Sequence, residues 1–159
     1  MIIIREIDSS DKKSSIANNI LRALPEWFGI EASIVDYVEQ VKRMPLLVAL
    51  DGEKEVGFLA IKLHNPFSAE ICVMGVLKEY HGQGIGKVLL EACEEYCYKE
   101  KIEFLTVKTL AESHPDENYA KTRKFYLKSG FKALEVFPLL WGESNPCLFM
   151  VKKVELLEK

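Results

Sequence analysis

Apolar residues recur along this chain of 159 residues with two different periods, and segments of the two kinds alternate. Spacings of three and four, as at Ile16, Ile20 and Leu24, are typical of amphipathic helices. They predict helices at 11–24, 33–44, 85–101 and 119–129. Short runs rich in β-branched and aromatic residues, bounded by turn residues, indicate strands. They predict strands at 2–7, 46–50, 55–63, 70–77, 104–109, 131–137 and 147–154.

The resulting order, β-α-α-β-β-β-α-β-α-β-β, predicts an α/β fold. A chain of this length can bury one core of ordinary size, so we expect a single domain over residues 1–159. One mixed sheet with helices on both faces is the architecture that this order favours.

A glycine-rich turn, HGQGIG, joins the strand at 70–77 to the long helix that follows. Gly82, Gly84 and Gly86 leave the backbone N–H groups bare at the positive end of a helix dipole, which suits a phosphate or pyrophosphate. Two common glycine motifs do not fit. The dinucleotide fingerprint needs glycine at Lys87, and the Walker A pattern needs glycine at His81.

The turn does fit the pattern Q/R-x-x-G-x-G/A through Gly84 and Gly86, with His81 in place of Gln or Arg. A second segment, YAKTRKFYLKSGF, is similar to the pattern A-x-x-x-Y-x-x-x-G-F and contains Tyr126. Both patterns, in this order, belong to the GNAT superfamily of acetyl-CoA-dependent N-acetyltransferases, which the chain resembles over nearly its whole length. The resemblance also implies the GNAT fold, whose element order is the one predicted above.

The resemblance implies acetyl-CoA as cosubstrate. The backbone after the fourth strand would bind the pyrophosphate, at His81, Gly82, Gln83, Gly84, Ile85, Gly86 and Lys87. The end of that strand would pair with the pantetheine arm and turn one N–H toward the thioester oxygen, at Met74, Gly75 and Val76. Tyr119 stands where many relatives carry an asparagine that contacts the pantetheine arm.

Two residues are candidates for proton transfer. An alkyl amine with a pKa of about 10.4 must lose its proton before it attacks, which costs about 4–5 kcal/mol at pH 7. The segment Ala69–Glu70–Ile71 matches the stretch that carries the catalytic glutamate in the histone-acetylating branch, so Glu70 is the candidate general base. The resemblance makes Tyr126 the candidate general acid for the CoA thiolate. The alternatives are a salt-bridged strand glutamate and a core tyrosine.

The acceptor pocket of this family is built from the first two helices, their connector and a late loop. The corresponding candidates here are Trp27, Phe28, His64, Phe67 and Trp141. Aromatic residues there suit an apolar or a cationic amine, although ordinary core packing is the alternative. The amine itself is not identified by the sequence, and small-molecule and peptide acceptors both stay open.

Composition limits the expected partners and the expected location of the protein. The formal net charge is −3, and no basic patch with interleaved aromatics occurs, so no nucleic-acid partner is expected. No run of about eighteen apolar residues occurs, and the start, MIIIREID, lacks a signal-peptide pattern, so we expect no membrane span and a cytoplasmic location. Cys93 and Cys97 share a helix face, but no second pair completes a metal site. We expect no metal, and reduced cysteines that pack as small core residues.

The leading interpretation is therefore an N-acetyltransferase in which an amine attacks the thioester directly. One alternative is a non-catalytic acyl-CoA-binding or sensing domain on the same fold. A second is another phosphate-binding α/β protein, which the two failed glycine motifs disfavour. A homodimer is a further expectation, because small members of the family often dimerise.

Overall fold

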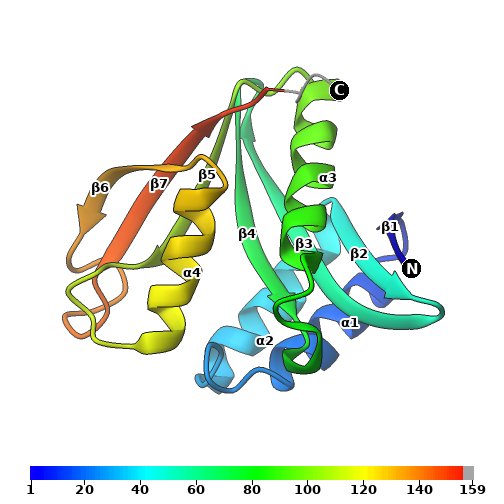
Figure 1. Cartoon of the computed structure of the whole chain (residues 1–159), viewed down its shortest axis with the longest axis horizontal. Coiled ribbons are helices and arrows are strands. Elements are labelled where there is room, and N and C mark those ends of the chain that lie inside the picture. Colours follow the sequence, from blue (N-terminus) through cyan, green and yellow to red (C-terminus); the bar gives the residue numbers. More distant parts are fainter. Residues whose placement is uncertain (156–159) are drawn as a thin grey trace.

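A mixed, seven-stranded sheet organises residues 1–155, which are the residues that the computed structural model describes. Its strand order is β1-β2-β3-β4-β5-β7-β6 (Figure 1). The strands are β1 (Ile2–Ile7), β2 (Leu46–Asp51), β3 (Lys54–Asn65), β4 (Ser68–Val76), β5 (Phe104–Leu110), β6 (Lys132–Phe137) and β7 (Cys147–Lys153). The helices are α1 (Ser10–Arg22), α2 (Glu31–Gln40), α3 (Ile85–Lys99) and α4 (Glu117–Lys128), with short 3-10 turns at Val41–Arg43 and Lys78–Tyr80. The predicted α/β class and mixed sheet are confirmed.

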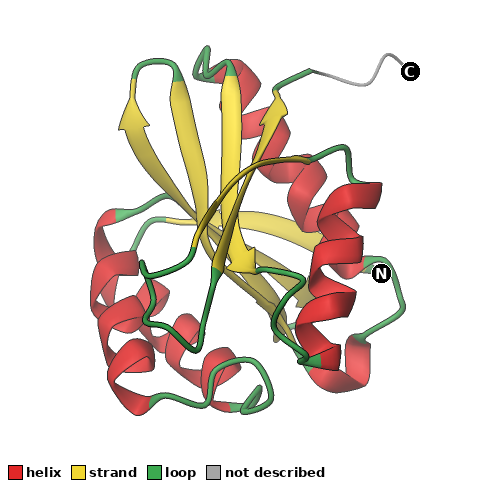
Figure 2. Cartoon of the chain, turned by 90° about the vertical axis from the view of Figure 1, so that its left-hand side faces the viewer, coloured by secondary structure: helices red, strands yellow, loops and turns green. Residues whose placement is uncertain are grey.

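The helices cover the two faces of the sheet in pairs (Figure 2). On one face, α1 and α2 enclose a core that includes Ile16, Leu21 and Phe58. On the other, α3 and α4 pack over a second core that includes Leu89 and Phe131. Apolar residues at three- and four-residue spacing on each helix are buried in these cores, as the sequence pattern requires.

Local signals set the helix ends. Ser9 caps α1 by accepting a hydrogen bond from the Lys12 N–H, and Asp116 caps α4 in the same way. The third helix ends at Lys99, two residues earlier than predicted, because Lys101 adopts the left-handed conformation with φ of 62°. The second ends at Gln40 and tightens into a 3-10 turn before Pro45.

Strands β4 and β5 form the only parallel pair in the described sheet, and they are paired only over their first four residues. Their ladder runs from Ser68↔Phe104 to Ile71↔Val107, and beyond it the two strands diverge (Figure 1). A bulge lies at the same point, because Ile71 pairs with Ile61 on β3 while Val73 pairs with Ala60. The sheet therefore opens between its two central strands.

Within residues 1–155 no helix has the length and apolar character needed to cross a membrane. In the same range, no group of three or more His, Cys, Asp or Glu side chains is placed to hold a metal ion.

Candidate active site

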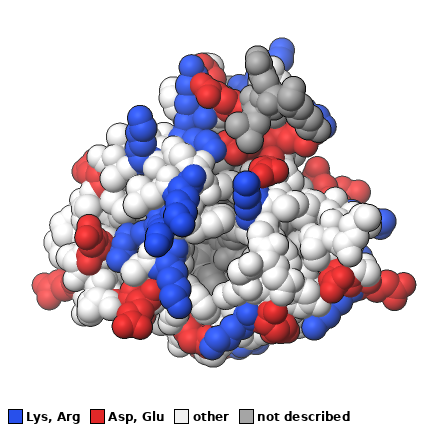
Figure 3. Space-filling view, in the orientation of Figure 1, with Lys and Arg blue, Asp and Glu red and all other residues white. Residues whose placement is uncertain are grey.

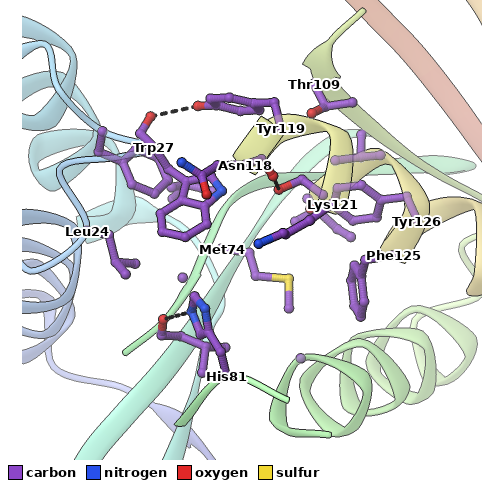
Figure 4. A pocket seen from close by; sticks show the side chains of 18 of the residues that line it. Leu24, Trp27, Met74, His81, Thr109, Asn118, Tyr119, Lys121, Phe125 and Tyr126 are labelled. Atoms are coloured by element: carbon purple, nitrogen blue, oxygen red, sulfur yellow. Dashed lines mark hydrogen bonds between the residues drawn. The ribbon is translucent and has the colours of Figure 1, made fainter. Parts of the chain in front are cut away.

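A cavity of about 530 Å³ occupies the opening between β4 and β5 (Figure 4). Its wall includes Ile71 and Val107, which belong to the core under α3 and α4. It also includes Cys72 and Lys108, which alternate with them and therefore face the opposite side of the sheet. The cavity thus runs through the sheet and can be approached from both faces.

The glycine turn forms one end of the cavity. Gly82 and Gly84 have φ of 78° and 81°, a conformation that favours glycine. Gly84 is the N-cap of α3, which therefore begins at Ile85 without a side-chain cap. Its first N–H groups are therefore free for an anion. A Cβ on Gly86 would lie 3.3 Å from a ring carbon of Phe125, so glycine there also lets α3 and α4 approach closely.

Positive charge surrounds this end. Lys87 and Lys121 line the cavity on the side of α3 and α4. Lysine and arginine side chains gather along the edge of the hollow on this face (Figure 3). Bare helix N–H groups and lysines together are suited to phosphate groups.

His81, the departure from the family pattern, braces the turn. Its Nε2 lies 2.6 Å from the Val76 carbonyl oxygen, which can only accept, so Nε2 carries the proton. Its ring also meets the Trp27 ring edge-on, with centroids 5.4 Å apart. His81 therefore ties the glycine turn to the end of β4 and to the connector between α1 and α2.

Tyr119 spans the cavity from α4 to the same connector. Its hydroxyl donates a 2.7 Å hydrogen bond to the Trp27 carbonyl oxygen, drawn as a dashed line in Figure 4. Burial raises the pKa of Tyr119 to about 12, so the hydroxyl keeps the proton that it donates. The neighbouring Asn118 also lines the cavity.

Tyr126 lies in the cavity wall and in the core at once. It is buried, with edge-on contacts to the rings of Phe125 and Phe131. Burial raises its pKa well above the ordinary value near 10, with smaller contributions from Cys93 and Tyr119. The hydroxyl therefore stays protonated at neutral pH and can donate a hydrogen bond into the cavity.

Glu70 lies beside the cavity, not in its wall. Its side chain is 9% exposed and accepts two 3.1 Å hydrogen bonds from Lys108 Nζ. His64 Nε2 lies 2.7 Å from the same carboxylate. Lys108, with 29% of its side chain exposed, thus stands between Glu70 and the cavity.

The structure gathers some of the predicted acceptor residues and not others. Trp27, Phe28 and Trp141 line the cavity, whereas His64 and Phe67 do not. Phe67 lies in the turn before β4, ahead of the part of that strand that lines the cavity from Ile71 onward. His64 lies near the end of β3 and contacts Glu70 beside the cavity.

Several cavity residues were not predicted. They are Leu24, Tyr37, Ile71, Cys72, Val73, Tyr80, Val107, Lys108, Thr109, Asn118, Lys121, Thr122 and Phe125. Thr109 is notable because its Oγ1 is buried and has no hydrogen-bond partner. Such a hydroxyl in a cavity wall is suited to a ligand, since buried polar groups are normally paired. The one sequence signal for this group was Lys108, the single charge in a strand of apolar and threonine residues.

The cysteine in the cavity is not poised as a nucleophile. Burial, and then the nearby Glu70 carboxylate, raise the pKa of Cys72 to about 11. Only about 0.1% of the thiol would be ionised at pH 8, and the thiolate is the reactive form.

Fold and site together define an α/β protein with a cavity suited to a phosphate-bearing ligand where its sheet opens. A family model described as an acetyltransferase (GNAT) domain matches residues 42–133. The chain therefore belongs to the GNAT acetyltransferase family, a family of acyltransferases. A search of curated protein sequences finds no significant match.

Solved structures agree with this assignment at the level of the fold. A GNAT-family protein from Desulfovibrio desulfuricans superposes with a TM-score of 0.81 at 14% identity, covering 98% of this chain and 100% of the other. An aminoglycoside 6'-N-acetyltransferase complexed with coenzyme A gives 0.75 at 20% identity, covering 99% of each chain. A GNAT-family acetyltransferase from Elizabethkingia anophelis with acetyl-CoA bound gives 0.72 at 16% identity, covering 96% and 97%.

Proposed function

We propose that the protein transfers an acetyl group from acetyl-CoA to a primary amine by direct attack of the amine on the thioester. The observation that carries the proposal is the cavity through the sheet, with a bare, lysine-flanked helix N-terminus on one side. The structural relatives with CoA or acetyl-CoA bound support the choice of cosubstrate.

The cosubstrate would lie on the side of α3 and α4. Its pyrophosphate would accept hydrogen bonds from the backbone of residues 82–87, and its pantetheine arm would pair with Met74, Gly75 and Val76 of β4. The divergence of β4 from β5 leaves this stretch without a partner on that side. An N–H of the same stretch would stabilise the oxyanion that forms on the thioester carbonyl.

Glu70 and Tyr126 would handle the protons on opposite sides of the sheet. A proton leaving the amine reaches Glu70 through a water or the Lys108 ammonium, and the half-exposed His64 connects Glu70 to solvent. Tyr126, on the α4 side, donates a hydrogen bond to the thiolate that leaves. General acid–base assistance of this kind contributes roughly 10²–10⁴-fold.

Direct attack is favoured over an acetylated enzyme because the cavity lacks an activated thiol. Cys72 is the only cysteine among the described lining residues, and its raised pKa keeps it protonated. Replacing Cys72 with alanine should therefore leave a working enzyme.

The test is calorimetric titration with acetyl-CoA, with CoA, NAD and ATP as comparators, followed by assay of thiol release with a panel of amines. Micromolar binding confined to the CoA species, with amine-dependent thiol release, would support the proposal. Binding without release from any amine would favour a non-catalytic acyl-CoA-binding domain. Preference for NAD or ATP would overturn it.

A further inference from the structure

We propose that the acceptor is an amine with an apolar or aromatic group and a carboxylate beside the nitrogen, as in an aromatic α-amino acid. This inference rests on the proposed function and adds the class of acceptor. It depends on three features of the cavity: the end that the cosubstrate leaves open, the charges in its wall, and the position of Lys108.

The open end of the cavity faces α1 and α2. The glycine turn and α4 occupy the other side, so the acceptor must enter between the α1–α2 connector and the loop after β6. The side chains there are almost all apolar or aromatic. They are Leu24, Trp27, Phe28, Tyr37 and Trp141. Such a wall binds an apolar or flat group by burial and ring contacts.

The charges in the wall disfavour a polycation. In the part of the chain that the structure describes, no aspartate or glutamate lines the cavity, whereas Lys87, Lys108 and Lys121 do. A second or third ammonium group on the acceptor would lose its hydration beside lysines, with no carboxylate in the wall to pair with it. Aminoglycosides and polyamines are amines of that kind. The structural relative that acts on an aminoglycoside therefore shares the fold without indicating this acceptor.

Lys108 is the group that can recognise an acid. It comes from β5 on the acceptor side of the sheet, directly after the last β4–β5 pair at Val107. An ammonium has three N–H donors, and the two bonds to Glu70 leave the third for a ligand. Glu70 and the Phe149 ring, 5.6 Å from Nζ, hold the lysine in place. A carboxylate on the acceptor would accept that third N–H.

His64 contacts the Glu70 carboxylate as well and helps to fix its position. Its Nε2 lies 2.7 Å from Glu70 Oε1, so the Glu70 carboxylate is shared between a histidine and Lys108. The carboxylate is thereby held from two sides. The lysine can thus serve a second anion while Glu70 keeps it oriented.

Matched acceptors provide the test. Thiol release is measured with phenylalanine against 2-phenylethylamine, and with tryptophan against tryptamine, each pair differing only in the carboxylate. Spermidine and kanamycin represent polycations. We expect kcat/KM about tenfold or more higher for each amino acid than for its decarboxylated partner, because a charged hydrogen bond is lost. The polycations should be the poorest acceptors.

Two variants locate the effect. Lys108→Met keeps an unbranched side chain of nearly the same length and removes its charge, so the ratio within each pair should fall to about one. Lys121→Met removes a cavity lysine on the cosubstrate side, and it should lower acetyl-CoA affinity without changing the ratio. The ratio is the informative quantity, because a loss of stability or of proton transfer lowers both members of a pair together.

The outcomes separate this inference from the proposed function. Faster turnover of the decarboxylated amines or the polycations would overturn the inference, as would a preference unchanged in Lys108→Met. Acetyl-CoA binding with no thiol release from either amino acid would also overturn it. Failure to bind acetyl-CoA in the calorimeter would instead remove the proposed function itself.

Discussion

Replacing Gly84 with alanine tests whether the glycine turn binds the cosubstrate. Gly84 has φ of 81°, and a Cβ added there would meet nothing within 4 Å. The substitution therefore adds no clash and acts only through the backbone, where a left-handed non-glycine residue costs about 1–2 kcal/mol. In the free protein the exposed turn can relax away from this strain. A bound pyrophosphate requires the left-handed conformation at residue 84, so the strain lowers the binding free energy.

If the whole 1–2 kcal/mol, roughly, is lost from the binding free energy, the Kd for acetyl-CoA rises about 5- to 30-fold. Calorimetric titration measures this change. Gly52 supplies the matched control, because it has φ of 63° at the tip of the β2–β3 hairpin and is equally open. Gly52→Ala should lower the free energy of unfolding by a similar 1–2 kcal/mol, roughly, and leave the Kd unchanged. An unchanged Kd in Gly84→Ala would refute a pyrophosphate site at this turn.

Four further substitutions probe the site and its frame. Tyr126→Phe should lower kcat about 100-fold with an unchanged Kd for acetyl-CoA, and a full-rate variant would contradict the role. In the unaltered protein, the raised pKa of Tyr126 implies no loss of activity through its ionisation below about pH 10. Glu70→Gln should slow turnover most at low pH, where the amine is most protonated, and an unaltered pH–rate profile would rule out a base at this position. Thr109→Val removes a buried, unpaired hydroxyl, so the free energy of unfolding should rise by about 1 kcal/mol. Acetyl-CoA should bind about 2- to 10-fold more weakly, and equal affinity would show that the ligand does not use Oγ1. Lys152 Nζ lies 2.9 Å from Glu94 Oε1 and is partly buried. Glu94→Gln removes the opposite charge and leaves Lys152 with the Ser129 carbonyl oxygen, so the free energy of unfolding, measured with denaturant, should fall by about 3 kcal/mol.

The last of these perturbations acts on a contact that ties α3 to α4 and β7. Lys152 Nζ donates a 2.5 Å hydrogen bond to the Ser129 carbonyl oxygen at the end of α4. Its contact with Glu94 is one of charge, bent too far for a hydrogen bond, since Glu94 Oε1 has no hydrogen-bond partner. None of these three residues lines the cavity, so acetyl-CoA affinity at low denaturant should not change.

Hydrophobic periodicity was enough to predict the strands, the helices and their order. The helices 85–101 and 119–129 carry clear apolar stripes, and the turn at 81–86 is local in sequence, so both could be read without tertiary information. The cavity residues Gly82, Gly84, Ile85, Gly86 and Lys87 belong to that local pattern, whereas Gln83 of the same turn does not line the cavity. Tyr126 was implied by the family resemblance, through its spacing to Gly130.

The other half of the cavity depends on contacts between distant residues. The Lys108–Glu70 bond joins positions 38 residues apart, and it needs both side chains on one face of the sheet. Beyond Glu70, strand alternation alone does not fix the faces of β4, because the bulge at Cys72 puts Cys72 and Val73 on the same side, toward α1 and α2. One extra residue reverses every later side chain on a strand. The sequence does not reveal where such a bulge lies.

The opening between β4 and β5 explains why the two proton-handling candidates lie where they do. Tyr126 belongs to the core under α3 and α4, whereas Glu70 faces the opposite side with Cys72 and Tyr37, whose pKa values its charge helps to raise. In a transfer by direct attack, the amine adds to the thioester carbon and the tetrahedral intermediate then expels the thiolate, so the amine must lose a proton and the thiolate must gain one. A base on the acceptor face and an acid on the cosubstrate face satisfy both needs without moving either side chain through the sheet. An acetylated-enzyme route would need a nucleophile within the opening, and Cys72, the cysteine there, is held as a thiol.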